Sequence, residues 1–129
     1  MITPEQLAKN GTEDCHQAAL FCWASLPETQ QRYPELAKLF FAIPNGGERN
    51  KIVAAKLKAT GVKSGVTDLL LAVPRKLYHG LFIELKKIGG RPEKDQVAFI
   101  EAVRAQGYAA CICEGWMSAK DAVVSYLDQ

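Results

Sequence analysis

Two short runs of apolar residues that also carry charges constrain the fold of this chain most strongly. Residues 68–73 are apolar after Asp68, and residues 81–86 are apolar apart from Glu84 and Lys86. Runs that are apolar on both faces are typical of central strands covered by helices on each side. The polar connection between the runs contains Pro and Gly, which predicts an antiparallel hairpin.

A hairpin symmetric about Lys76 places Asp68 directly opposite Glu84, because each lies eight residues from that centre. Directly opposed Cβ atoms are about 4.5–5.5 Å apart, and Glu84 and Lys86 share a face because strand side chains alternate. Two carboxylates at that distance repel each other unless a cation lies between them. Oxygen ligands of this kind suit Mg²⁺ or Mn²⁺.

The same residues have a plainer interpretation. Glu84 and Lys86 then mark the end of a strand that reaches solvent, and Asp68 caps the start of another. Charged residues make up 23% of the chain, so a D…ExK pattern is frequent by chance. The interpretation of this pattern as an active site therefore requires support from other parts of the sequence.

The whole chain, residues 1–129, is expected to form a single domain with its own core. Helices are predicted from Thr12 as N-cap to about Ser25, from near Pro34, over 49–59, from Pro92 at the first helical position to Gln106, and from Ser118 as cap to Leu127. Strands are predicted at 39–43, 68–73, 81–86 and 108–113. The order α-β-α-β-β-α-β-α predicts an α/β fold with a mixed sheet between helices.

Charge and cysteine content exclude little. The formal net charge of +2 indicates no particular partner, although basic residues gather in 49–63 and 75–94. Such clusters can bind a phosphate backbone, but most are only solvated surface. The four cysteines are expected to be reduced, buried hydrophobes. A zinc site formed by Cys15, His16, Cys111 and Cys113 is an alternative that lacks C-x₂-C spacing.

No apolar run approaches the roughly 18 residues that a membrane span needs, and the N-terminus has no basic-then-apolar signal pattern. We therefore expect a cytoplasmic location and no membrane partner.

Gln96 is a second unusual residue. On the predicted 92–106 helix it is in line with Ile100 and Val103, the stripe expected to face the sheet. A buried amide needs hydrogen-bond partners, which the end of a strand could supply. Because this helix follows the 81–86 strand directly, Gln96 could instead orient a metal-bound water or a phosphate.

Several spaced elements resemble the VRR-NUC family of the PD-(D/E)XK nuclease superfamily. They are IPNGGER at 43–49, GVKSGVTD at 61–68, GLFIELK at 80–86, Gln96, and an E-x-x-x-Q element from Glu13 to Gln17. The resemblance implies a restriction-endonuclease-like fold and divalent-metal-dependent hydrolysis of DNA phosphodiesters. Stand-alone members of this length resemble phage and prophage proteins, which tend to be homodimers acting on branched DNA such as four-way (Holliday) junctions.

The resemblance also implies a role for individual residues. Asp68 and Glu84 match the metal-binding acids, and the carbonyl group of Leu85 would complete the metal shell. Lys86 matches the catalytic lysine, and Gln96 matches the glutamine of the following helix.

The resemblance also involves an acid on the first predicted helix and a residue that departs from the family pattern. Glu13 matches the helix-borne acid that would act in catalysis and metal binding, although the adjacent Asp14 is an alternative. Thr67 stands where the motif usually has proline, which affects backbone geometry before Asp68 rather than chemistry.

The turn at 43–49 is a candidate DNA contact. Asn45, Gly46, Gly47 and Arg49 could bind the DNA backbone through amide and guanidinium groups. A turn followed by an exposed helix explains the asparagine and both glycines equally well.

The sequence therefore predicts a small metal-dependent DNA endonuclease, with a non-catalytic DNA-binding or scaffold protein of the same fold as the rival. A homodimer would supply two symmetric sites. Aromatic residues offer apolar material for its interface, unless they simply form the core: Phe21, Trp23, Phe40, Trp116 and Tyr126.

Overall fold

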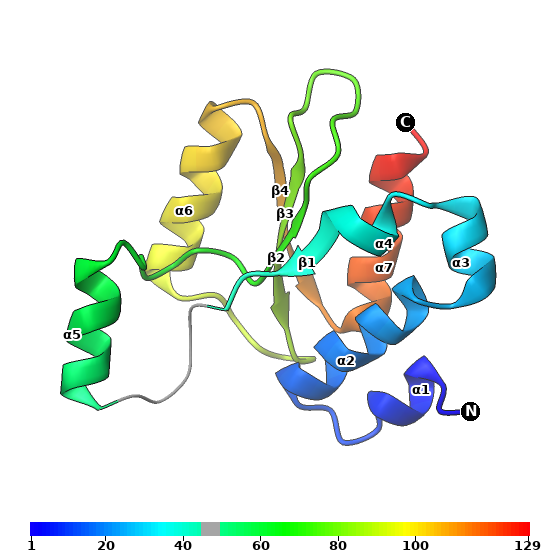
Figure 1. Cartoon of the computed structure of the whole chain (residues 1–129), viewed down its shortest axis with the longest axis horizontal. Helices are drawn as coiled ribbons and strands as arrows, with labels where there is room; N and C mark the ends of the chain where they lie inside the picture. Colours follow the sequence, from blue (N-terminus) through cyan, green and yellow to red (C-terminus); the bar gives the residue numbers. More distant parts are fainter. Residues whose placement is uncertain (45–49) are drawn as a thin grey trace.

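A computed structural model describes residues 1–44 and 50–129 of the chain (Figure 1). Its elements, in chain order, are α1 (Pro4–Leu7), α2 (Glu13–Ala24), α3 (Pro27–Arg32), α4 (Leu36–Leu39), β1 (Phe40–Ala42), α5 (Lys51–Ala59), β2 (Leu69–Leu71), β3 (Leu81–Lys86), α6 (Lys94–Ala105), β4 (Ala109–Glu114) and α7 (Trp116–Leu127). No helix within the described residues is long and apolar enough to cross a membrane.

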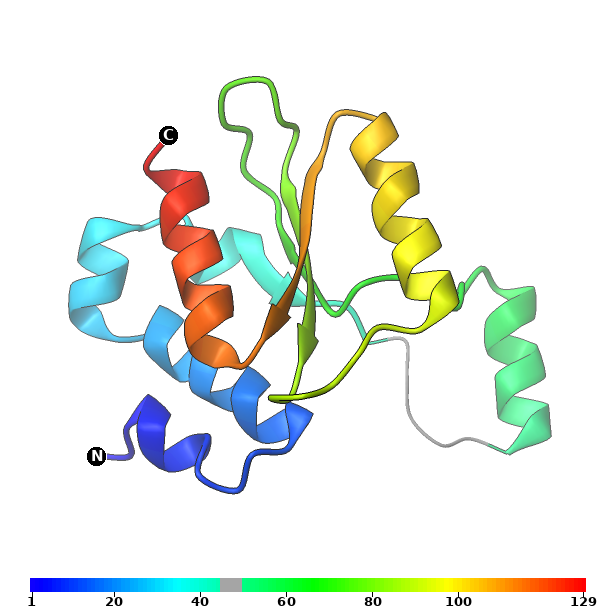
Figure 2. The same cartoon turned by 180° about the vertical axis from the view of Figure 1, so that it is seen from behind.

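The four strands form one mixed sheet in the order β1-β2-β3-β4. β1, β2 and β3 pair antiparallel, whereas β3 and β4 are parallel and are joined by α6. The predicted α/β fold with a mixed sheet between helices is confirmed. Figures 1 and 2 show α2 and α7 on one side of the sheet and α6, with α5 beyond it, on the other side.

The hydrophobic core lies between the sheet and the pair α2 and α7. Odd-numbered residues of β2 and β3 point to this side, and Leu69, Ile83 and Leu85 are almost completely buried there. They pack in one cluster with Leu20 of α2 and Val123 of α7. Burying one such side chain stabilises the fold by about 1.5–3 kcal/mol, so this layer fixes the position of β3.

Even-numbered residues of β3 point to the α6 side, because strand side chains alternate. The Phe82 ring meets the edge of the Phe99 ring of α6 at a centroid distance of 5.3 Å. Arg104 of α6 donates to the carbonyl oxygen of Ala110 in β4 at 2.7 Å. Glu84 and Lys86 therefore share a face with Phe82, next to α6.

The candidate interface aromatics belong to the core. Trp23, Phe40, Trp116 and Tyr126 are all less than 8% exposed, and the Phe21 ring stacks on Phe40 at 4.8 Å. The interpretation that these rings are core residues is therefore confirmed.

Two helix starts differ from the sequence prediction. α6 begins at Lys94 with Glu93 as N-cap, so Pro92 lies before the helix rather than at its first position. α7 begins at Trp116 after Gly115, so Ser118 lies inside the first turn and does not cap it. A tertiary contact from His16 explains the second difference and is described with the site below.

The first third of the chain contains more helix than predicted. Thr12 caps α2 as expected, since its Oγ1 accepts from the Cys15 N–H at 3.1 Å. The short helix α4 corresponds to the one predicted from near Pro34, whereas α1 and α3 were not predicted, and α3 starts at Pro27. Proline suits the first helical position because its missing N–H would have no partner there.

Gly65 holds the segment before Asp68 against the first turn of α6. Its φ is +85°, and a Cβ atom at this position would lie 2.5 Å from the carbonyl oxygen of Asp95. Gly61 has a φ of +101°, but a Cβ there would meet nothing within 4 Å. Both glycines therefore have a left-handed backbone conformation, but only at Gly65 would an added Cβ atom clash with a neighbour.

We predict that Gly65→Ala destabilises the protein clearly more than Gly61→Ala does. The left-handed backbone costs an L-residue about 1–2 kcal/mol at either position, and only Gly65→Ala adds a backbone clash. Urea denaturation of both variants measures the difference. Equal losses would show that the Gly65 segment moves away from α6 without cost.

Candidate active site

Asp68 and Glu84 are opposite each other across the β2–β3 pair. Leu69 pairs with Ile83, and the same register continued by one residue pairs Asp68 with Glu84. The predicted opposition of Asp68 and Glu84 is therefore confirmed. The tip of the connection differs from the prediction, because Arg75 pairs with Tyr78 and centres the turn between Lys76, whose φ is 48°, and Leu77.

The backbone of Leu85 fixes the Asp68 carboxylate. β2 begins at Leu69, so the Leu85 N–H extends past its end, and Asp68 Oδ2 accepts from it at 2.8 Å. The backbone carbonyl oxygen of Asp68 accepts from the Ile43 N–H at 2.7 Å. The N–H and C=O groups of one strand residue point to the same edge, so the Leu85 carbonyl group is directed to the edge where Asp68 lies.

Glu84 is a buried carboxylate with unsatisfied oxygens. Its side chain is 1% exposed, and neither Oε1 nor Oε2 has a hydrogen-bond partner among the described residues. Lys86 Nζ lies 3.3 Å from Glu84 Oε2, close enough for an ion pair but outside hydrogen-bond geometry. Buried polar atoms rarely lack a partner, so these oxygens keep their lone pairs available to a cation.

Lys86 is also buried, with a side chain only 9% exposed. The interpretation that Glu84 and Lys86 mark a strand end in solvent is therefore wrong. The two side chains point to the α6 side of the sheet, because hydrophobic contacts hold the intervening Leu85 in the core.

Burial, followed by repulsion from the Asp68 carboxylate, raises the pKa of Glu84 from its ordinary 4.5 to about 8, although the Lys86 ammonium opposes the shift. Near neutral pH this carboxyl group therefore favours a bound proton, or a cation that replaces it.

Oxygen donors at this site fit a hard divalent cation. The carboxylates of Asp68 and Glu84 and the carbonyl oxygen of Leu85 are the ligand types that Mg²⁺ and Mn²⁺ prefer. Mg²⁺ commonly binds through one or two carboxylates and keeps several waters, so two acids suffice.

Glu13 lies on the first turn of α2 and is exposed to solvent, as is Asp14. In residues 1–44 and 50–129, no group of three or more His, Cys, Asp or Glu side chains could hold a metal ion. The structure therefore does not join Glu13 to the pair of Asp68 and Glu84.

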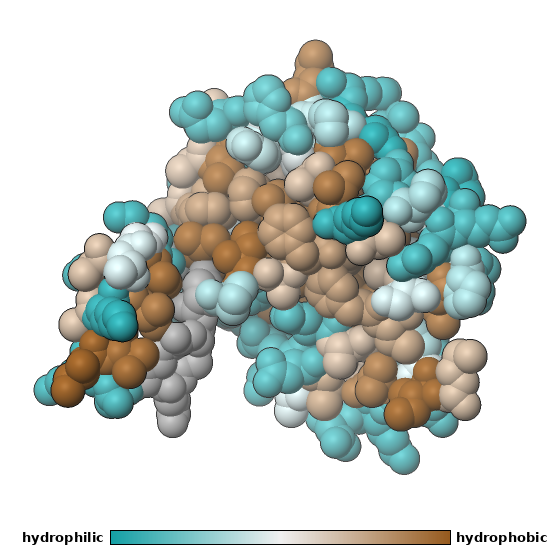
Figure 3. Space-filling view, viewed as in Figure 1, coloured by the Kyte–Doolittle hydropathy of each residue, from teal (hydrophilic) through white to brown (hydrophobic). Residues whose placement is uncertain are grey.

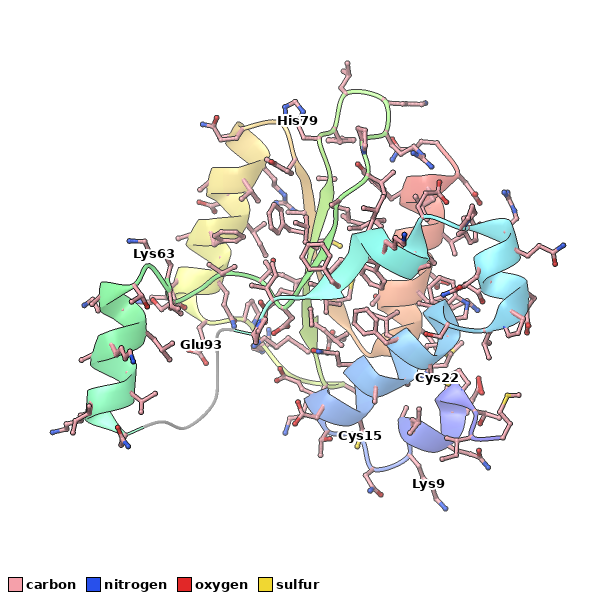
Figure 4. All side chains as sticks on the ribbon, viewed as in Figure 1. Lys9, Cys15, Cys22, Lys63, His79 and Glu93 are labelled. Carbon is pink, nitrogen blue, oxygen red and sulfur yellow. The ribbon has the colours of Figure 1, made fainter. Side chains whose placement is uncertain are left out.

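The alternative zinc site is likewise not assembled among the described residues. Cys15 and Cys22 lie on α2 (Figure 4), whereas Cys111 and Cys113 lie on β4 with their sulfur atoms 3.6 Å apart. All four cysteines are free thiols.

Gln96 is half-buried and makes a local bond. Its Oε1 accepts from the Glu93 N–H at 2.7 Å, which caps the start of α6. This interaction differs from both predicted roles of Gln96, a bond to a strand end and the orientation of a metal-bound water. The orphan donors of a helix start explain why a glutamine is favourable here.

Thr67 and the turn at 43–49 also belong to the pattern that resembles the VRR-NUC family. Thr67, in the proline position, is completely buried, and its hydroxyl donates to the Leu69 carbonyl oxygen at 3.4 Å. The predicted DNA contacts lie outside the described residues: Asn45, Gly46, Gly47 and Arg49.

His16 was not predicted to support the site. Its Nδ1 accepts from the Trp116 N–H at 3.1 Å, which caps α7. The adjacent Gly115 N–H donates to the Lys86 carbonyl oxygen at 2.8 Å. These two bonds connect α2, α7 and the end of β3. In the sequence, only the presence of a histidine on the apolar side of α2 could have indicated them.

For the metal-free protein, we predict that the free energy of unfolding falls with rising pH relative to that of the Glu84→Gln variant. The pKa of Glu84 is about 8 in the folded state and ordinarily 4.5, so the folded state binds more protons between these values. The stabilisation is present below pH 4.5, is lost as pH rises through 8, and is on the order of a few kcal/mol. Denaturation curves between pH 5 and 8.5 measure it, and parallel pH profiles would contradict it.

Known proteins resemble this chain in sequence and in fold. The sequence model of the VRR-NUC domain matches residues 6–117. A solved structure described as a VRR-NUC domain protein aligns with a TM-score of 0.76 and 29% sequence identity, covering 91% of this chain and 88% of that one. No curated protein matches significantly. The chain belongs to the VRR-NUC domain family.

Proposed function

We propose that the protein is a divalent-metal-dependent DNA endonuclease that hydrolyses phosphodiester bonds. The observation that carries the proposal is the pair formed by half-buried Asp68 and buried Glu84, in which the Glu84 oxygens lack hydrogen bonds beside Lys86. Membership of the VRR-NUC domain family supports a nuclease-type, DNA-processing function.

Asp68, Glu84 and the Leu85 carbonyl group would hold Mg²⁺ or Mn²⁺. A bound ion of this kind polarises a phosphate and lowers the pKa of a coordinated water. The bond from the Leu85 N–H keeps the Asp68 carboxylate in place before the ion arrives, so binding requires little reorganisation.

Lys86 supplies a positive charge on the same face. Its ammonium group lies 3.3 Å from Glu84 Oε2, and release from that partner would let it stabilise negative charge developing on the scissile phosphate. Charges positioned in a partly dry site are effective because they need not reorganise during the reaction. The Gly115 bond to the Lys86 carbonyl oxygen fixes the backbone from which this side chain extends.

A non-catalytic scaffold with the same fold is less well supported. A scaffold gains nothing from a buried Glu84 carboxylate opposite Asp68, because this arrangement costs free energy unless Glu84 is protonated or bound to a cation. Glu13 and Gln96 remain proposed catalytic residues, whose participation requires movement or bridging waters when DNA binds.

We expect Lys86→Ala to lower DNA cleavage in Mg²⁺ or Mn²⁺ by at least about 100-fold, the usual cost of removing one group that stabilises transition-state charge. Lys87→Ala is the matched control, because that lysine is the next residue and is exposed. DNA affinity and the melting temperature of each variant should be measured alongside cleavage. A folded Lys86→Ala protein that cleaves at the rate of the Lys87→Ala control would refute the catalytic role.

We also propose that the enzyme acts as a homodimer on branched DNA such as four-way junctions. Resolution of a junction needs two symmetric cuts, and a two-fold dimer places two identical sites about one axis. Four of the five candidate aromatics are buried within the chain: Trp23, Phe40, Trp116 and Tyr126. These four do not supply the interface, so other surfaces must form it.

The predicted result in light scattering is a particle of about twice the 14.2 kDa chain mass. In a panel of single-strand, duplex, flap and four-way-junction DNA, we expect the junction to be cleaved fastest. A monomer that cuts junctions symmetrically would contradict the dimer, and equal rates on all four substrates would contradict the preference.

A further inference from the structure

The segment from Asn50 to Ser64, called here the α5 arm, carries only positive charge. It contains four lysines, at positions 51, 56, 58 and 63, and no acidic residue occurs between Asn50 and Thr67. All four lysines are exposed, and none forms an ion pair with another described residue. Their charges are therefore available to a partner.

α5 is not packed into the domain. None of its residues is buried, and Ile52 is 81% exposed. The helix stands away from the sheet, on the same side as α6, in Figures 1 and 2, and Figure 3 shows it as a separate lobe. Hydrophobic burial, which holds most protein helices in place, does not explain this one.

Local interactions define α5 instead. Asn50 Oδ1 accepts from the Val53 N–H at 2.8 Å and caps its start. The Thr60 hydroxyl donates to the Lys56 carbonyl oxygen at 2.9 Å near its end. Lysines in the last turn also complement the helix dipole.

The C-terminal end of the arm connects to the acid pair, since Ser64 is followed four residues later by Asp68. It leads back to Asp68 through Gly65, which is packed against Asp95 of α6. Lys63 lies at the end of the arm nearest α6 (Figure 4). Positive charge is therefore placed on the side of the sheet to which Glu84 and Lys86 point.

We propose that the α5 arm binds the phosphate backbone of duplex DNA next to the scissile bond. The proposal rests on the proposed nuclease function, because a carboxylate pair repels DNA unless positive groups nearby hold the flanking phosphates. Contacts of lysine with phosphate position a protein on DNA without reading its sequence. A two-fold contact between two arms is disfavoured, since it would bring their unpaired lysines together.

The test compares Lys56→Gln/Lys58→Gln with a control pair, Lys9→Gln/Lys38→Gln, that removes one exposed lysine just after α1 and one from α4. Binding of fluorescein-labelled duplexes of several sequences is measured by anisotropy without metal, as a function of salt. The arm variant should bind every sequence more weakly, and the slope of log affinity against log salt should become shallower by about 2. The control should match the wild type.

Hydrolysis of bis(p-nitrophenyl) phosphate in Mn²⁺ separates this proposal from the proposed function. The ester is too small to need the arm, so the arm variant should hydrolyse it at the wild-type rate. A wild-type protein inactive on this ester and on DNA would refute the nuclease while the binding slopes still test the arm. Unchanged DNA affinity in the arm variant would overturn the proposal. Unchanged affinity combined with a halved mass in light scattering would instead identify the arm as an interface between copies.

Discussion

The bond from the Leu85 N–H to the Asp68 carboxylate is the interaction on which the site depends. In this register Leu85 would pair with Thr67, but β2 begins two residues later at Leu69, and the Asp68 side chain accepts from the Leu85 N–H instead at 2.8 Å. The bond fixes one acid, keeps the β2–β3 register, and leaves the Leu85 carbonyl group at the same edge. A slip of one residue would turn Glu84 and Lys86 into the hydrophobic core and abolish the site.

Without a bound cation or proton, the buried Glu84 carboxylate lowers the stability of the folded protein. Glu84 is buried with both oxygens unsatisfied, and its raised pKa measures the cost of its charge. The surrounding structure holds the group in place through independent contacts: the core layer under Leu85, the Gly115 bond to Lys86, and the packing of Gly65 on α6. A cation or a proton relieves the conflict, which is the behaviour expected of a site kept for function rather than for stability.

The sequence was sufficient to predict the sheet, the hairpin register and the convergence of Asp68, Glu84 and Lys86, because strand alternation and turn residues are local signals. It was insufficient where tertiary contacts override local ones. His16 caps α7 across 100 residues of sequence, so Ser118 is not needed. Gln96 is a different case, because its bond to the Glu93 N–H is local, and the sequence pattern did not distinguish this cap from a contact with a strand end or a bound water. The helical pattern of residues 49–59 predicted a helix, but nothing in it indicated that no residue of α5 would be buried.

Anomalous X-ray scattering from crystals grown with Mn²⁺ tests the central claim most directly. The account predicts one peak per chain, about 2.0–2.3 Å from a carboxylate oxygen of Asp68, a carboxylate oxygen of Glu84 and the Leu85 carbonyl oxygen, distances typical of a small hard divalent cation. The peak should be absent in the Asp68→Asn variant. A Mn²⁺ peak elsewhere, with Glu84 still paired only with Lys86, would contradict the account.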